Sequence, residues 1–355
     1  NGRAPGPVGV GEDGRCWGAM VTPTQGSLAS SSDNLGGVYA TASKDKHKTP
    51  KEREAAMLYV VAETHLNEEE DDAALKVSQE ALAIFRQLSD MSGAADAVRM
   101  IVHVLIYQDR RQEADGTARD ELVRIRKGGD RIGEGQMLLS IADANCEHRG
   151  AKSLEDALMC ASDAQVLFRD QGNKVMEANA MLTLINIHLR RKQQDFAVAL
   201  ALAESAQAIF KELGDARGEA LALHGKAFAH VRARDAKVEV QPTPGGWQGA
   251  MRESAKILQG QELKKLEAFI RTCTAQWMTA EHPRRAVRLA EEALACCKDS
   301  GSRYEPAALG VLVQAHLAIT DMSQGWRHKE AGEAVQIARA GLKRFKEQRD
   351  GPGEG

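Results

Sequence analysis

Apolar residues recur at helical spacing along most of the chain, and the longest stretch with this pattern contains no proline. None of the nine prolines lies between residues 51 and 241. The same stretch is rich in Ala, Leu, Glu, Arg and Gln, which are strong helix formers. A proline inside a helix would remove a backbone hydrogen bond and clash with the preceding turn. The pattern therefore predicts one helix after another and an all-α fold.

A short phrase ends several of the predicted helices. Its clearest copies run over residues 81–90 and 206–215, and weaker copies run over 164–173 and 121–130. After each copy, a small or acidic residue opens another apolar-rich helix. The bulky residue of the phrase marks a period of about 42 residues and predicts seven repeating units. It recurs at Phe85, Ile125, Phe168, Phe210, Leu258, Cys297 and Phe345.

The phrase has a physical role at each turn. Its Gly can take the left-handed conformation that ends a helix, and the Asp or Asn after it can cap the next helix. One helix pair cannot bury its apolar face alone, whereas stacked pairs can. Two intervals are longer than the rest, and they contain insertions at 238–248 and 320–329. The sequence therefore predicts a solenoid of stacked helix pairs.

The residues at 206–220, Ala…Phe…Leu-Gly-Asp-x-x-Gly-Glu-Ala, followed by His224-Gly225 and Phe228, resemble the tetratricopeptide repeat family. The most similar type is its longer variety, with repeats of about 40 residues, found in Pins-type polarity scaffolds and kinesin light chains. The resemblance covers about 51–350 and implies a right-handed superhelix of about seven helix pairs. The fifth, sixth and seventh units lack the Gly-Asp phrase, which predicts an irregular superhelix there. The expected units lie near 51–93, 94–133, 134–176, 177–218, 219–261, 262–304 and 305–350, before a tail at 351–355.

Residues 1–50 differ in composition from the repeats. They contain nine Gly, four Pro and nine Ser or Thr, with few large apolar residues. Such a segment cannot bury a core of its own, so we expect an extended N-terminal arm. Its scattered anchors could pack on the solenoid itself or, in the interpretation we favour, on a partner protein. These anchors are Trp17, Met20, Val21, Leu28, Val38 and Tyr39.

The resemblance also implies a concave groove lined by the first helix of each pair. Mapping from Gly225 and Phe228 gives an apolar lining, which would suit an apolar helix or an extended segment. A competing interpretation is that several of these side chains form the seam between helices. The expected lining is Ala97, Val98, Ile101, Val104, Leu105, Met137, Leu138, Ile141, Ala144, Ala180, Met181, Leu184, Ile187 and His188.

Histidines and charged runs give weaker signals. His188 and His230 lie 42 residues apart, at equivalent places in successive repeats. They could face a ligand together, but repeat geometry explains the spacing as well. The acidic run at 67–72 and the basic clusters at 190–192 and 284–285 suit solvated loops, with docking of an oppositely charged partner as the alternative.

Composition and motifs narrow the classes of function. A net charge of −3 argues against nucleic-acid binding, which needs a clustered basic excess. A period near 42 also disfavours a helical RNA binder with units of about 35 residues. Residues 9–14 match GxGxxG, but no strand precedes them and no helix follows. The sequence contains no HExxH, P-loop or GxSxG motif. We therefore expect no enzymatic activity and no catalytic, cofactor-binding or metal-binding residues.

The cysteines indicate the compartment. The six cysteines show no paired metal spacing, and most lie in apolar helical stretches, as small buried side chains would in a reducing compartment. A disulfide between Cys296 and Cys297 is disfavoured because adjacent side chains on a helix diverge by about 100°.

The longest apolar run, 196–203, is too short to cross a bilayer. The start at Asn1 would suit an organelle protein (plastid or mitochondrial) that has lost a leader, and the cytoplasm stays open.

These features favour a protein-interaction role. The first hypothesis is a non-catalytic scaffold, an accessory or linker subunit of a large protein complex, with the arm as a tether. The alternative is a soluble adaptor that captures peptides or helices transiently in the groove. Either would have protein partners and no nucleic acid. Peripheral association with a membrane complex is compatible with both.

Overall fold

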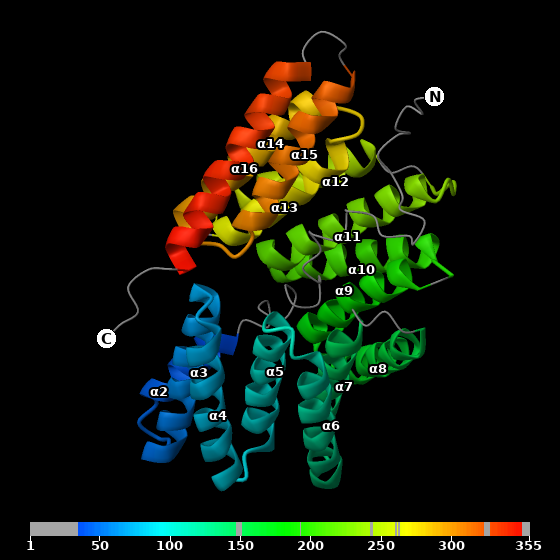
Figure 1. Ribbon diagram of the computed structural model, residues 1–355. Helices are drawn as coiled ribbons and strands as arrows, with labels where there is room; N and C mark the ends of the chain where they lie inside the picture. Colours follow the sequence, from blue (N-terminus) through cyan, green and yellow to red (C-terminus); the bar gives the residue numbers. More distant parts are fainter. Residues whose placement is uncertain are drawn as a thin grey trace. The chain divides into compact units, whose positions relative to one another are not determined.

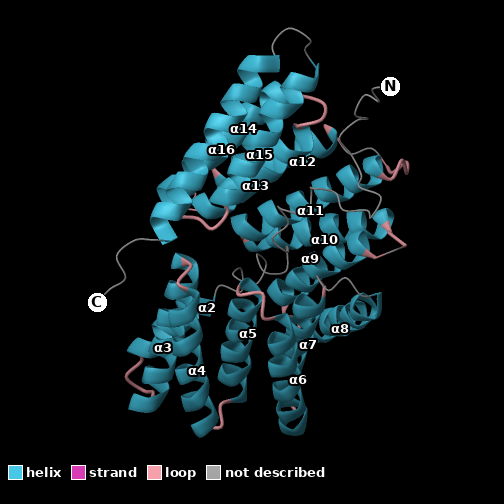
Figure 2. Cartoon of the chain, in the orientation of Figure 1, coloured by secondary structure: helices cyan, strands magenta, loops and turns pink. Residues whose placement is uncertain are grey.

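The described part of the chain is built from helices. The computed structural model describes residues 35–146, 151–191, 193–241, 244–259, 261, 263–322 and 327–349, and no strand occurs within these ranges (Figures 1 and 2). The all-α prediction is confirmed. None of the described helices is both long enough and apolar enough to cross a bilayer.

After the short helix α2 (Leu35–Lys44), the described helices follow one another as seven pairs. Consecutive helices pack together from α2 to α12 and again from α14 to α16, and first helices also pack on the next first helix, as α5 does on α7 and α9 on α11. This neighbour-to-neighbour packing confirms the predicted helical solenoid. The pairs are α3 (Pro50–Glu68) with α4 (Asp71–Gln87), α5 (Met91–Tyr107) with α6 (Arg111–Gly128), α7 (Arg131–Asn145) with α8 (Ala151–Asp170), α9 (Lys174–Arg190) with α10 (Phe196–Leu213), α11 (Ala216–Asp235) with α12 (Gly246–Leu258), α13 (Lys264–Met278) with α14 (Pro283–Ser300), and α15 (Glu305–Met322) with α16 (Arg327–Arg349).

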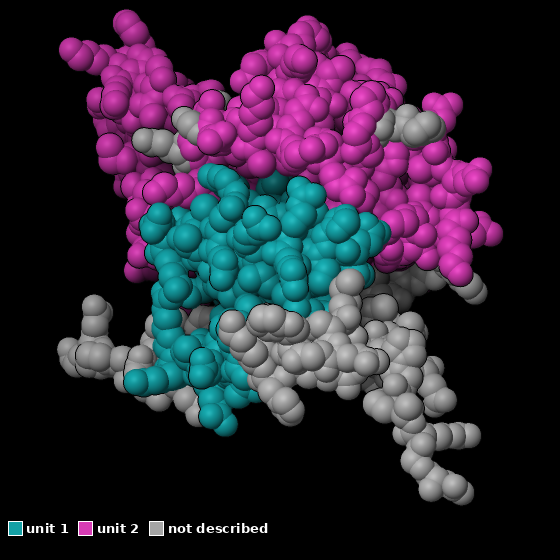
Figure 3. Space-filling view, turned by 90° about the horizontal axis from the view of Figure 1, so that it is seen from above, with its two compact units in different colours: residues 1–23, 267–355 teal, residues 24–266 magenta. Residues whose placement is uncertain are grey.

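The helices fall into two compact units, divided after Leu266 near the start of α13 (Figure 3). The larger unit contains α2 to α12. The smaller unit contains most of α13 and all of α14 to α16. Within the smaller unit, the rings of Phe269 and Tyr304 lie 5.4 Å apart, and Arg271 forms ion pairs with Glu267 and Glu292. Each unit therefore has packing contacts of its own.

Asp or Asn caps the first helix of four successive pairs, as the repeat phrase predicts. The side chain accepts a hydrogen bond from the backbone N–H three residues ahead, at 2.9–3.2 Å. These bonds satisfy donors that an uncapped helix start would leave without a partner. The capping residues are Asp90, Asp130, Asn173 and Asp215.

The residue before each cap has left-handed backbone geometry. Gly129, Gly172 and Gly214 have φ values of 78°, 69° and 69°. The equivalent residue in the first turn is Ser89, with a φ of 57°. Glycine adopts this geometry without steric cost, whereas serine does not. The predicted glycine C-cap is therefore confirmed at three turns and replaced by a strained serine at one.

The aromatic residue of the phrase packs across the turn. The Phe85 and Phe210 rings are buried, and each lies directly against the glycine three residues after the cap, Gly93 or Gly218. A methyl group on either glycine would overlap the ring. The glycine of the Asp-x-x-Gly spacing thus leaves room for the ring, so the end of one helix pair packs closely against the start of the next.

First and second helices differ in how much of their surface is buried. In α4, the buried residues form a single stripe from Ala74 to Phe85. In α5, every residue from Gly93 to Ile106 is buried. A helix enclosed on all sides forces any polar side chain it carries into the interior, where it needs a partner.

The structure corrects the expected boundary of the arm. Residues 35–44, expected to be extended, form helix α2. Leu35 and Tyr39 pack against the hydrophobic core, and this contact stabilises a segment whose composition alone does not favour a helix. Thr49 then caps α3 in a reciprocal arrangement with Glu52.

The two predicted insertions differ in outcome. The first lies mostly in the connection between α11 and α12, which ends at Gly245. The second is partly helical, because α15 continues to Met322 and α16 already begins at Arg327. Residues 320–322 and 327–329 therefore extend helices instead of forming the expected loop.

Candidate functional site

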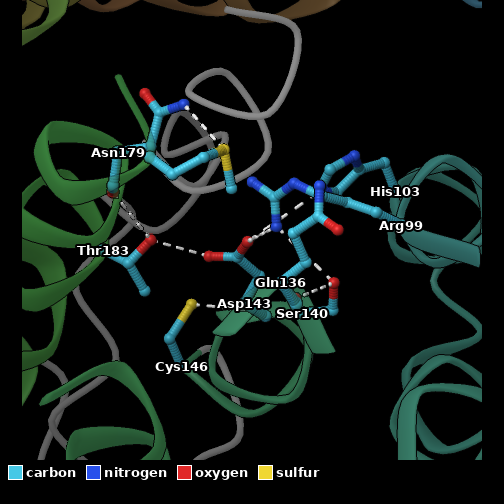
Figure 4. A network of polar contacts seen from close by, with 9 residues as sticks. Arg99, His103, Gln136, Ser140, Asp143, Cys146, Asn179 and Thr183 are labelled. Carbon is cyan, nitrogen blue, oxygen red and sulfur yellow. Dashed lines mark hydrogen bonds and ion pairs between the residues drawn. The ribbon is translucent and has the colours of Figure 1, made fainter. Parts of the chain in front are cut away.

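Buried polar side chains occupy matching positions in three successive first helices. Counted from the capping residue, they lie 6, 9 or 10, and 13 positions along the helix, a spacing that places them on one side. We name this set the polar stripe, and Figure 4 labels its members other than Asp96 and Asn186. It comprises Asp96, Arg99 and His103 in α5, Gln136, Ser140 and Asp143 in α7, and Asn179, Thr183 and Asn186 in α9.

Asp143 is the centre of the polar stripe. Its Oδ1 accepts a hydrogen bond from Thr183 Oγ1 at 2.8 Å. Its Oδ2 lies 3.6 Å from Arg99 Nη1 and 3.8 Å from His103 Nε2. Asp143 and Arg99 are only 1% and 2% exposed, so this is a charge pair taken out of water. One carboxylate thus connects α7 with both of its neighbouring first helices.

Asp96 forms a second centre at the α2 end of the polar stripe. It accepts hydrogen bonds from the Tyr39 hydroxyl and from Gln136 Nε2, both at 2.6 Å. Between the two centres, Arg99 Nη1 donates to Ser140 Oγ at 3.5 Å. The contacts run without a break from α2 through α5 and α7 to α9.

Some buried atoms of the polar stripe have no hydrogen-bond partner among the described residues. They are the acceptors Gln136 Oε1 and Asp143 Oδ2 and the donor Asn186 Nδ2. A buried polar atom without a partner costs about 1–3 kcal/mol. Gln136 Oε1 and Asn186 Nδ2 therefore leave one acceptor and one donor for an added polar group.

The polar stripe ends at α11. The equivalent positions there hold Leu221, His224, Gly225 and Phe228. The His224 ring stacks on Phe228, with centroids 6.3 Å apart. Burial lowers the pKa of His224 to about 3, so this imidazole is neutral at physiological pH.

The residues expected to line the groove form the packed core instead. All except His188 are buried, and most belong to the hydrophobic core of the larger unit. This is the arrangement that the competing seam interpretation describes. Counted from the capping residues, Gly225 and Phe228 align with Ser140 and Asp143, one residue before the Ile141 and Ala144 of the expected lining. One residue is about 100° of rotation around a helix, which turns the chosen set away from the polar stripe.

The remaining predicted anchors are split between described and undescribed residues. Tyr39 lies in α2 and contacts the solenoid itself, whereas Trp17, Met20, Val21 and Leu28 lie outside the described residues, as does the 9–14 motif. Burial lowers the pKa of both His188 and His230. Each of these histidines has its own charged neighbours: Asp195, Arg191 and Glu155 for His188, and Lys226 and Glu204 for His230.

Cys146, Cys160, Cys273 and Cys297 are buried, as the sequence predicted. Burial raises the pKa of Cys160 to about 11 and raises that of Cys273 as well. Thiols held in the protonated form are weak nucleophiles and poor metal ligands. Cys16 lies outside the described residues.

One group of possible metal ligands was not singled out from the sequence. Ligand atoms of His65, Glu68 and Glu70 lie within 4.8 Å of one another, where α3 ends. His65 Nδ1 is 2.6 Å from Glu70 Oε2. Both glutamates are exposed, and an ordinary surface hydrogen bond accounts for the contact.

Comparison of the chain with protein-family models and with curated protein sequences finds no match. The tetratricopeptide resemblance therefore stays a prediction that depends on the residues quoted for it.

The polar stripe is visible in the sequence as Asp96, Gln136 and Asn179, and again as His103, Asp143 and Asn186, at intervals of one repeat. Polar residues that recur once per repeat inside apolar helices could have predicted the polar stripe from the sequence.

Proposed function

We propose that the chain is a non-catalytic protein-interaction scaffold, an accessory or linker subunit of a multiprotein assembly, with the segment before α2 as a tether. The observation that carries the proposal is the polar stripe. Gln136 Oε1 is an acceptor and Asn186 Nδ2 a donor without a hydrogen bond, and both suit a protein segment, which presents N–H and C=O groups along its backbone.

The architecture supports the same conclusion. Stacked helix pairs expose long continuous surfaces, and repeat proteins use such surfaces to bind other proteins. The tetratricopeptide resemblance adds the expectation of protein partners and of no nucleic acid. The compartment would be a reducing one, either an organelle or the cytoplasm.

A second candidate is a soluble adaptor that binds peptides or helices transiently. The unmatched atoms also favour this candidate, because they leave the polar stripe incomplete without a ligand. A transient ligand would leave the chain free for much of its lifetime, whereas a constitutive subunit would not be free. The size of the native particle therefore distinguishes the two.

The first test is the native size of the endogenous protein after gentle extraction, combined with crosslinking mass spectrometry. The scaffold proposal expects a large complex with crosslinks to constant neighbours. A particle near the chain's own 38.5 kDa would contradict it and favour the adaptor.

A matched pair of variants tests the role of the polar stripe. Asn186→Leu removes the unmatched amide without changing charge, and it should weaken recovery of the crosslinked partner about tenfold. Val123→Asn changes an exposed residue of α6 and should leave recovery unchanged. Equal recovery with both variants would exclude the polar stripe as the docking surface.

A further inference from the structure

Helix α2 packs against α3, and the side chains of Leu35 and Tyr39 anchor it on the hydrophobic core. The Tyr39 ring stacks on Tyr59 with centroids 4.1 Å apart and meets the edge of Phe85 at 5.7 Å. Its hydroxyl donates to Asp96 at 2.6 Å. Leu35, one turn earlier, packs against the same core. The contact therefore combines two aromatic rings, an aliphatic position and a buried carboxylate.

Little else in α2 favours its helical state. It has ten residues, of which Gly36 and Gly37 each disfavour a helix by about 1 kcal/mol relative to alanine. None of its residues is fully buried, and Val38 is 62% exposed. A peptide of this length is not helical by itself in water. The position of α2 thus depends on Leu35 and Tyr39, which makes it easy to displace.

The surface under Tyr39 is selective for a ring that can donate a hydrogen bond. Tyr59 and Phe85 would accept any aromatic ring, but Asp96 is a buried carboxylate that loses a donor if the hydroxyl is absent. Burial and the Asp96 charge raise the pKa of Tyr39, so its phenol stays protonated and remains a donor. Tyrosine therefore fits here better than phenylalanine.

We propose that Tyr59, Phe85 and Asp96 form a docking site for a partner helix carrying Leu-x-x-x-Tyr, and that α2 occupies this site in cis until such a helix displaces it. The spacing is that of Leu35 and Tyr39. This inference is independent of the proposed role of the polar stripe as a whole, because it depends only on the contacts of α2.

A partner helix can compete with α2 in spite of the tether. An occupant on the same chain has an effective concentration in the millimolar range, so a competitor needs higher intrinsic affinity. A partner with alanine or another helix former in place of Gly37, where an added Cβ would meet nothing within 4 Å, gains that affinity, because less conformational entropy is lost on binding. The two glycines keep α2 a weak occupant.

The test uses the full chain and a fluorescent peptide with the sequence of residues 33–46, in which Gly37 is replaced by alanine and Gly36, which lies against Glu63, is kept. Binding is measured by fluorescence anisotropy to the wild type and to Tyr39→Ala. The peptide should bind Tyr39→Ala at least about tenfold more tightly, because the cis occupant has lost its anchor. A second peptide with Phe in place of Tyr should bind about tenfold more weakly than the first.

Val38→Ala is the matched control, since Val38 lies beside Tyr39 but is exposed. It should bind the peptide like the wild type. Equal affinity for wild type and Tyr39→Ala, or for the Tyr and Phe peptides, would overturn the proposal.

A measurement on a milder variant guards against misfolding of Tyr39→Ala. Amide hydrogen exchange in α2 should be about tenfold faster in Tyr39→Phe than in the wild type, while exchange in α3 and α4 stays unchanged. Unchanged exchange in α2 would also overturn the proposal. Neither readout requires a native partner, so failure here leaves the scaffold proposal untouched.

Discussion

Helices α5, α7 and α9 can be compared directly with α11, because all four are first helices of their pairs with the same capped start. Three of them carry polar residues 6 and 13 positions after the cap, whereas α11 carries Leu221 and Phe228 there. Helix α5 is buried at every residue from Gly93 to Ile106, whereas α11 is only partly buried at Lys226, Phe228 and His230. Helix α11 nevertheless packs against its neighbours without polar residues at these two positions.

The comparison shows what the polar residues change. In α11, the buried ring of His224 stacks on the partly buried ring of Phe228. In α7, Asp143 holds a buried charge among Arg99, His103 and Thr183. Buried charges cost more free energy than apolar side chains of similar volume unless they are fully paired. A costly arrangement repeated in three helices supports a role beyond folding.

The largest expected effect comes from breaking the charge pair. Asp143→Leu should lower the free energy of unfolding by about 3–5 kcal/mol, because it removes the carboxylate that faces buried Arg99. The double variant Arg99→Leu, Asp143→Leu makes this region resemble α11, and it should be more stable than the single variant. Urea unfolding of the wild type, both single variants and the double variant measures the coupling. Additive losses would contradict a paired site.

An intermediate effect is expected from His224, the α11 counterpart of Arg99. Its pKa is about 3 in the folded chain and about 6.5 when unfolded, so the unfolded chain takes up the proton first as pH falls. The stability that the neutral form provides is complete above pH 6.5 and is lost towards pH 3. Between pH 7 and pH 5 this one group should lower the free energy of unfolding by about 2 kcal/mol.

Thermal or urea unfolding at both pH values checks this dependence on pH. His224→Leu should abolish the part of the pH dependence due to this group. Replacement of the exposed His47 by Gln serves as the control and should retain that part. If the free energy of unfolding of His224→Leu still changes with pH as much as that of the wild type, another group causes the pH dependence.

The smallest expected effect concerns the turns before α5 and α11. Ser89→Gly should raise the free energy of unfolding by about 0.5–1 kcal/mol, because glycine relieves the left-handed strain that Gly214 avoids. Gly214→Ser should lower it by a similar amount. If the two exchanges change the free energy of unfolding in opposite directions, the two turns are equivalent. A loss of stability in Ser89→Gly would show that they are not.

The sequence predicted the parts of the fold that repeat. The turn phrase located the capped starts at Asp90, Asp130, Asn173 and Asp215, because glycine geometry and side-chain caps are local properties. The sequence did not predict helix α2, because its stability comes from tertiary contacts of Tyr39. Its two glycines also lower the helix propensity of the segment.

The candidate site was harder to predict for a geometric reason. Polar and apolar residues alternate so closely in α7 that Ser140 and Ile141 are neighbours facing different surroundings. An error of one residue in the alignment of repeats exchanged the polar stripe for the core. Only the contact between Asp96 and Gln136, or between Asp143 and Thr183, fixes the rotation of these helices.

The contacts within the polar stripe also bear on how fast the chain folds. Asp96 and Gln136 are 40 residues apart, as are Asp143 and Thr183, and Arg99 and Ser140 are 41 apart. Each contact thus closes a loop of one repeat, a small fraction of the 355 residues. Folding rates rise as contacting residues lie closer in sequence, because less loop entropy is lost before the contacts form. Two neighbouring pairs can therefore nucleate the structure, and the next pair can add to them without waiting for the distant end of the chain.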